Sequence, residues 1–156
     1  MIFQGIIVKL TRYAAKGAPG EALESAQFLD GLGMEGDYHA TGGERQISLL
    51  SLEERQWMDA QTEPGLCFGR YRENILLDGI PSAVLAPGVK ITAGEAVLEI
   101  SDTGKHCFEA CHLYRKGQSC VLSGRNLFAK VIRSGLVRTG DGVEEFSSTN
   151  GANERE

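Results

Sequence analysis

The chain lacks a long apolar run, and no stretch approaches the roughly 20 apolar residues that a membrane-spanning helix needs. Residues 1–10 lack the basic region, apolar core and cleavage site of a secretory signal. Basic residues are not in excess either, because the formal net charge is −5. That charge gives no electrostatic support for nucleic-acid binding. We therefore expect a cytoplasmic protein that binds neither nucleic acid nor a membrane.

Proline and tryptophan are scarce, whereas glycine is frequent, with 20 glycines in 156 residues. That length suits one domain, and a hydrophobic content of 42% is enough for a core. The chain has four cysteines. In a cytoplasmic protein thiols stay reduced, so these cysteines suggest chemistry, metal binding or packing before they suggest disulfides.

Short apolar runs separated by glycine-containing turns predict a mainly β fold that closes into a barrel. Ser51 and Glu54 form a capping box, which predicts one clear helix that ends near residue 60. Five glycines in residues 31–43 predict a shaped loop rather than a regular element. The expected strands are residues 2–10, 26–29, 45–50, 74–77, 89–91, 96–100, 127–132, 136–138 and 143–146, with short helical segments such as residues 108–114.

We expect the barrel domain to span residues 1–146. The remaining residues, 147–156, are polar and have no apolar pattern, so we expect a disordered tail.

Residues 105–112 hold two of the four cysteines and two of the three histidines. Lys105 and His106 directly precede Cys107, and neighbouring cations increase the thiolate fraction by lowering the pKa of a thiol. We therefore predict that Cys107 is a nucleophile or a sulfur carrier, with His106, His39 or His112 handling the proton. The alternative is that these cysteines are reduced and packed as small hydrophobic residues.

Cys111 follows Cys107 by four residues, so the two thiols would share one face of a helix. With Cys120 and a histidine they would complete a tetrahedral zinc site. Neither pair has the Cys-x-x-Cys spacing of a zinc finger, which speaks against zinc. Cys67, which lies in a loop after Pro64 and Gly65, is assigned to packing.

Two further groups of polar residues are candidates for binding. In the glycine-rich loop, Asp37 would accept hydrogen bonds from the N–H groups of a heterocycle, and His39 would donate to an oxygen. Arg45 and Asn74 each begin a predicted strand; an arginine suits phosphate and an asparagine suits the donor and acceptor edge of a pterin. The alternatives are an ordinary turn at Asp37, with His39 solvated, and a solubilising surface arginine.

Together these motifs resemble the MOSC domain, the module named after the C-terminal part of molybdenum-cofactor sulfurase. The motifs that carry the resemblance are residues 36–40, 45–50 and 73–75, and then Cys107. Residues 126–131, Gly135, residues 139–141 and the Gly-Lys-x-Cys-x-x-x-Cys segment at 104–111 are similar to small bacterial single-domain members. The sequence departs from the family pattern at Tyr38, Arg72 and His106.

The resemblance implies a closed MOSC-type β-barrel that binds molybdopterin or the molybdenum cofactor. The implied contacts are Asp37, His39, Arg45, Asn74, Lys105 and Cys107. Cys107 would coordinate molybdenum or carry sulfur as a persulfide, without pyridoxal phosphate. Implied partners are proteins of molybdenum-cofactor biosynthesis or sulfur donors, and an activity of the sulfurtransferase type would follow. The alternatives are a non-catalytic cofactor carrier or insertion partner, and a zinc-stabilised structural module.

Overall fold

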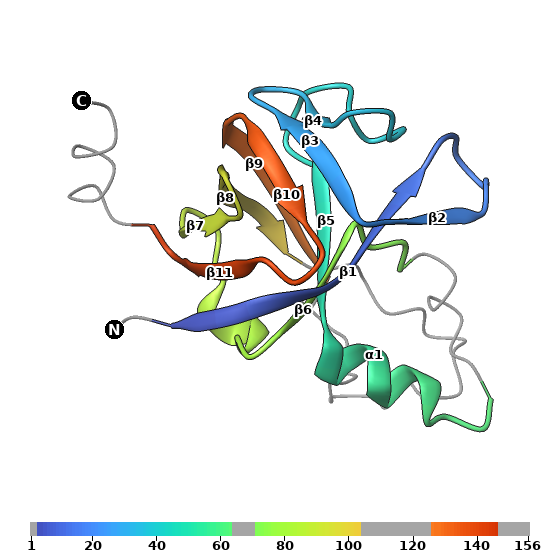
Figure 1. Ribbon diagram of the computed structural model, residues 1–156. Helices are drawn as coiled ribbons and strands as arrows, with labels where there is room; N and C mark the ends of the chain where they lie inside the picture. Colours follow the sequence, from blue (N-terminus) through green and yellow to red (C-terminus); the bar gives the residue numbers. More distant parts are fainter. Residues whose placement is uncertain (1–2, 64–70, 104–125, 147–156) are drawn as a thin grey trace.

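The computed structural model describes residues 3–63, 71–103 and 126–146 (Figure 1). Short strands dominate these residues, together with one α-helix and one 3₁₀ turn. The elements are β1 (Gln4–Tyr13), β2 (Gly20–Leu23), β3 (Ser25–Leu29), β4 (Gly33–Met34), β5 (Ile47–Ser51), α1 (Leu52–Asp59), β6 (Ile75–Asp78), η2 (Ser82–Val84), β7 (Lys90–Ala93), β8 (Ala96–Thr103), β9 (Leu127–Arg133), β10 (Gly135–Arg138) and β11 (Gly142–Glu145).

Seven strands close into a barrel in the order β11-β7-β8-β9-β5-β6-β1, and β1 pairs with β11 to complete the ring. β2 extends the sheet beyond β1, and β10, β3 and β4 form a second sheet (Figure 1). β5 and β6 are parallel, whereas the other pairings between described strands are antiparallel. Parallel neighbours need a crossover connection, and the segment with α1 provides it. The predicted mainly β barrel with one clear helix is confirmed.

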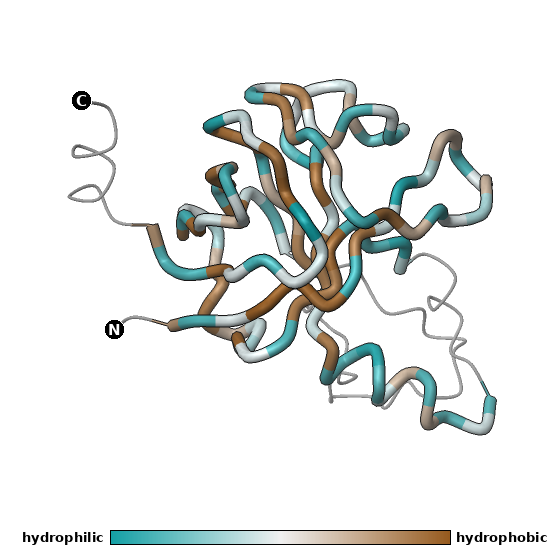
Figure 2. Tube along the Cα trace, in the orientation of Figure 1, coloured by the Kyte–Doolittle hydropathy of each residue, from teal (hydrophilic) through white to brown (hydrophobic). Residues whose placement is uncertain are grey.

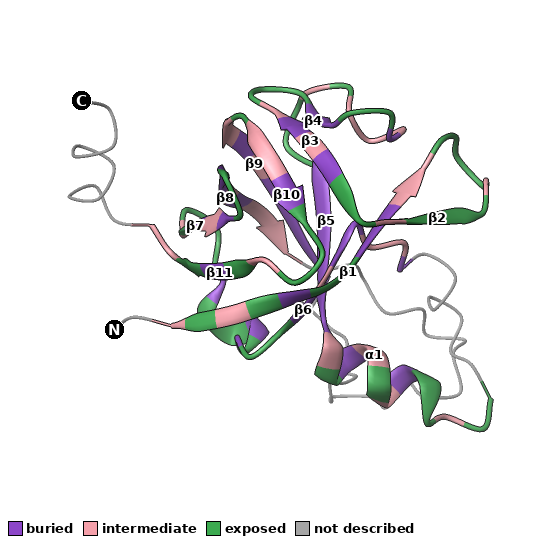
Figure 3. Cartoon of the chain, viewed as in Figure 1, coloured by how far each residue is buried: buried purple, intermediate pink, exposed green. Residues whose placement is uncertain are grey.

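Apolar side chains from every barrel strand fill the interior, and Figure 2 shows the apolar segments gathered in these strands. β5 is buried along its whole length (Figure 3). Its Ile47 and Leu49 belong to the interior core, whereas Leu50 points to the other face and packs with Met58 and Tyr71. Because α1 covers this outer face, β5 lacks the apolar–polar alternation of a half-exposed strand.

The helix begins where the sequence predicts it. Ser51 is the N-cap: its Oγ accepts a hydrogen bond from the backbone N–H of Glu54 at 3.3 Å and donates to Glu54 Oε1 at 2.5 Å. This pairing satisfies an N–H group that lacks a partner within the first turn of the helix. Among the residues that the structure describes, no helix has the length and apolar character to cross a membrane.

The structure also contains elements that the sequence did not predict. β2 pairs with β1, yet its residues are mostly exposed and carry no alternating pattern. β4 lies inside the glycine-rich loop 31–43, so that loop is not wholly irregular. β8 continues to Thr103 past a bulge between Ile100 and Asp102. The predicted helical segment 108–114 and the predicted tail lie outside the described residues.

Candidate functional site

Five residues form a row across neighbouring strands at one end of the barrel. Asp102 of β8 pairs with Phe128 of β9, which pairs with Ser48 of β5. The N–H of Asn74, just before β6, donates to the Ser48 carbonyl at 2.8 Å, and the N–H of Thr11 in β1 donates to the Asn74 carbonyl at 2.9 Å. The row brings together the ends of segments that are far apart in the sequence.

Asn74 is fully buried near the middle of this row. Its Oδ1 accepts from the backbone N–H of Ser48 at 2.9 Å, and its Nδ2 donates to the Thr11 carbonyl at 3.1 Å and to Asp37 Oδ1 at 3.0 Å. The side chain therefore joins β5, β1 and the glycine-rich loop. Both of its polar atoms bond to the protein itself.

Asp37 has a fully buried side chain, and it accepts hydrogen bonds from three protein segments. Besides Asn74 Nδ2, the donors are the backbone N–H of Tyr13 at 2.8 Å and the backbone N–H of His39 at 2.9 Å. Burial alone would raise the pKa of Asp37, but the hydrogen bonds from the His39 side chain and from the two backbone N–H groups outweigh it and lower this pKa. The carboxylate is therefore ionised at neutral pH.

His39 is oriented by that carboxylate. Its Nδ1 lies 2.8 Å from Asp37 Oδ2, and the ring centroid lies 4.0 Å from that of Tyr38. An ionised carboxylate only accepts hydrogen bonds, so Nδ1 carries the proton. Whenever the ring is neutral, Nε2 is consequently an acceptor. The side chain is 17% exposed, and the turn thus holds a base with a defined tautomer.

Arg45 lies at the other end of the row. Its Nε and Nη2 donate to Asp102 Oδ2 at 2.9 and 2.6 Å, and its guanidinium carbon lies 4.4 Å from the centroid of the Phe128 ring. The hydrogen bonds from Arg45 lower the pKa of Asp102. Half of the Arg45 side chain is exposed, so the guanidinium has room for another anion. Phe128 and Asn74 are two strand spacings apart, which is about 10 Å.

The structure therefore joins Asp37, His39 and Asn74 directly, and it places Arg45 farther along the same row. The predicted residues Lys105, His106 and Cys107 lie outside the described residues, as do Cys111 and Cys120, which were considered for zinc. Thr103, the last described residue before them, pairs with Leu127 beside the row. Within the described ranges, no cluster of three or more His, Cys, Asp or Glu side chains suits a metal ion.

Sequence reasoning missed several groups that hold these side chains. The backbone groups of Tyr13, Thr11 and Ser48 orient Asp37 and Asn74. Hydrogen bonds from backbone groups do not depend on residue type, so the sequence does not reveal them. The partner of Arg45, Asp102, stands at the end of an apolar alternating run, which was a usable signal for an ionic group at a strand end.

Comparisons with known proteins identify the family and support the fold. A family model described as the MOSC domain matches residues 36–144, which is well over half of the chain. The chain belongs to the MOSC domain family. The matched range contains the described candidate residues of this MOSC domain and also the segment with Cys107. No curated protein is similar enough to match the chain.

Solved structures share the fold at low sequence identity. The YuaD protein from Bacillus subtilis is 20% identical, with a TM-score of 0.67, and the alignment covers 94% of this chain and 99% of that one. YiiM from Escherichia coli is 19% identical, with a TM-score of 0.60 and coverages of 94% and 70%. YiiM from Geobacillus stearothermophilus is 14% identical, with a TM-score of 0.59 and coverages of 95% and 78%. These likenesses show the fold alone.

Proposed function

We propose that this MOSC domain binds a molybdopterin-type cofactor in the cytoplasm and carries sulfur on Cys107 for molybdenum-cofactor metabolism. The observation that carries the proposal is the hydrogen bond between Asp37 and Asn74, because it joins two separate family motifs at one place. Family membership makes a cofactor of this class the first candidate. The activity would be of the sulfurtransferase type, with a sulfur-donor protein as partner.

The described residues divide into groups that would touch the ligand and groups that would support them. Asp37 and Asn74 already use their side-chain polar atoms within the protein, so they would hold neighbouring residues in place without contacting the ligand. The side chains of His39 and Arg45 are partly exposed, and their Nε2 atom and guanidinium would contact the ligand. An imidazole acceptor and a guanidinium suit a heterocycle N–H and a phosphate, so the donor set fits the proposed ligand.

The Cys107 thiolate would attack the terminal sulfur of a donor persulfide, the donor's S–S bond would break, and the donor cysteine would leave as a thiolate. A nucleophilic acceptor would then attack the terminal sulfur of the Cys107 persulfide, the S–S bond would break, and Cys107 would leave as a thiolate. Lys105 and His106 adjoin this cysteine in the sequence, and positive charge stabilises a thiolate. His39, held by Asp37, or His106 would receive the proton of the attacking group. The cofactor itself would supply the dithiolene chemistry that binds molybdenum.

The test is to purify the protein from a host that makes molybdenum cofactor and to measure bound pterin, molybdenum and the mass of Cys107 peptides. We expect stoichiometric pterin and a mass increase of one sulfur on Cys107. Arg45→Ala should weaken pterin binding roughly tenfold or more, the effect of losing a charged hydrogen bond. Arg138→Ala removes the same charge from an exposed end of β10 and should bind normally.

Cys107→Ser should keep the pterin and lose the persulfide. If the wild type binds pterin but forms no persulfide when a sulfur donor is present, the result would support the alternative of a non-catalytic cofactor carrier. A protein that neither co-purifies with pterin nor binds it when it is added would refute the proposed function.

A further inference from the structure

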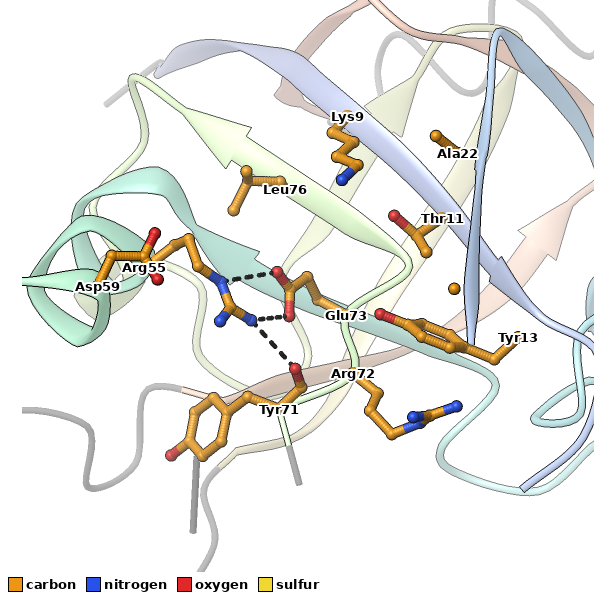
Figure 4. A pocket seen from close by; sticks show the side chains of 11 residues that line it. Lys9, Thr11, Tyr13, Ala22, Arg55, Asp59, Tyr71, Arg72, Glu73 and Leu76 are labelled. Carbon is orange, nitrogen blue, oxygen red and sulfur yellow. Dashed lines mark hydrogen bonds and ion pairs between the residues drawn. The ribbon is translucent and has the colours of Figure 1, made fainter. Parts of the chain in front are cut away.

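A pocket of about 620 Å³ lies over the outer face of β1 and β6, between β2 and α1 (Figure 4). Its volume falls within the range of small-molecule sites, about 300–1,000 Å³. The side chains of Asp37, His39, Arg45 and Asn74 are absent from its lining, although Thr11 and Tyr13, whose backbone groups hold Asp37 and Asn74, belong to it. The cysteine chemistry proposed above does not involve it either.

One wall of the pocket is a row of hydrogen-bond donors on β1. Lys9, Thr11 and Tyr13 alternate along the strand and therefore face the same side, with about 7 Å between successive members. Figure 4 shows the hydroxyls of Thr11 and Tyr13 directed into the space between β1 and α1. No hydrogen bond or ion pair within the described residues uses the Lys9 ammonium or these two hydroxyls.

The floor of the pocket provides a further cation. The guanidinium carbon of Arg72 lies 4.2 Å from the centroid of the Tyr13 ring, and one Nη donates to the Ala18 carbonyl. The Nε of Arg72 is buried without a hydrogen-bond partner. This Nε is closed off from the pocket, so Arg72 contributes its positive charge to the floor and no direct contact through Nε.

The opposite wall contains carboxylates, but the nearer of them is neutralised. Arg55 of α1 donates to Glu73 Oε1 and Oε2 at 2.6 and 3.1 Å, and also to the Tyr71 carbonyl at 3.0 Å. Asp59 lies at the last turn of α1. The lining has three basic and two acidic side chains, so its net charge is +1, whereas the whole chain carries −5. The pocket is locally positive on an acidic protein.

Burial, and then the Glu73 carboxylate, raise the pKa of the Tyr13 hydroxyl. The hydroxyl therefore stays protonated at physiological pH and remains a donor. The β1 wall therefore offers one ammonium and two hydroxyl donors. Such a set of donors is complementary to oxygen atoms that carry negative charge.

We infer that this pocket binds a small molecule through an oxyanion group, a carboxylate or a phosphate ester, which Lys9, Thr11 and Tyr13 hold by direct hydrogen bonds. Because Asp59 and the Glu73–Arg55 pair occupy the far wall, the rest of the ligand is polar or cationic rather than a second anion. Thr11 and Tyr13 use only backbone groups to hold Asn74 and Asp37, so the side chains that would contact a ligand differ between the two sites, and Lys9→Gln and Arg45→Ala test them separately.

The test is a titration of the isotope-labelled full chain with inorganic phosphate and, separately, with acetate, followed by backbone amide NMR shifts at constant ionic strength. We expect saturable shifts at residues 9–13 and 71–73. Lys9→Gln should weaken the binding about tenfold or more, and Thr11→Val and Tyr13→Phe should each weaken it about two- to tenfold, as for charged and neutral hydrogen bonds. Lys90→Gln, the same change at an exposed position of β7, is the matched control.

Each outcome decides the inference. Saturation by phosphate alone, or by acetate alone, supports it and identifies the group that the pocket holds. Absence of saturable shifts with both anions overturns it, as does a Lys90→Gln variant that loses as much affinity as Lys9→Gln. The amide spectrum of each variant shows whether it is folded. If Lys9→Gln fails to fold, Tyr13→Phe tests the inference instead, because it removes only the hydroxyl and keeps the ring over Arg72.

Discussion

Replacing Asn74 by alanine would remove three hydrogen bonds at a fully buried position. Two of them join backbone groups of Ser48 and Thr11, and the third reaches the ionised Asp37. A neutral hydrogen bond contributes about 0.5–1.5 kcal/mol and one to a charged group about 1.5–3 kcal/mol, so we expect a loss of about 3–6 kcal/mol in the free energy of unfolding. That loss is a large fraction of the stability of an ordinary domain, which is about 5–15 kcal/mol.

Urea denaturation followed by circular dichroism measures this loss. Thr92→Ala, which removes one hydrogen bond of 3.4 Å at a solvent-exposed site, is the control and should stay within about 0.5 kcal/mol of the wild type. A double-mutant cycle with Asp37→Ala isolates the contact between the two side chains. We expect a coupling of about 1–3 kcal/mol, because the two residues are in direct contact. Independent effects of the two substitutions, or a loss below about 1 kcal/mol for Asn74→Ala, would refute the assigned role of this hydrogen bond.

Three further predictions follow from the same structure. The folded state lowers the pKa of Asp37 below its ordinary value of 3.8, so its contribution to stability is present above that pH and is lost as the pH falls further. The free energy of unfolding of the wild type, measured by urea denaturation at a series of pH values, should therefore decrease below about pH 3.8. Asp37→Asn should show a shallower decrease over the same pH range, and an equal decrease would contradict the prediction. Gly135→Ala should lower the melting temperature by several degrees, because its Cβ would collide with the backbone of Glu95, and an unchanged melting curve would show that the hairpin adjusts. Brief iodoacetamide labelling with peptide mapping should modify Cys107 first; an unreactive Cys107 beside another labelled cysteine would contradict the sulfur-carrier assignment.

The sequence predicted most of the barrel, because its strands place apolar residues on the interior face and its turns contain glycine. The hairpin at Gly94, the helix start at Ser51 and the strand at residues 127–133 follow from such local signals. β2 escaped prediction because it is stabilised by pairing with β1 and carries little apolar surface of its own. β2 follows β1 after a short loop, and the stabilisation that it gains by pairing with that strand leaves no apolar alternation in its own four residues.

For the site, the sequence by itself determined the residue types and their order: an aspartate and a histidine in a glycine-rich loop, an arginine and an asparagine at strand starts, and a cysteine after a strand. Only the tertiary structure decided which of them touch. It turned Asp37 and Asn74 into a buried hydrogen-bonded pair, gave His39 a defined tautomer, and paired Arg45 with Asp102. The physical reason is that barrel closure sets the register between strands, and register decides which side chains become neighbours.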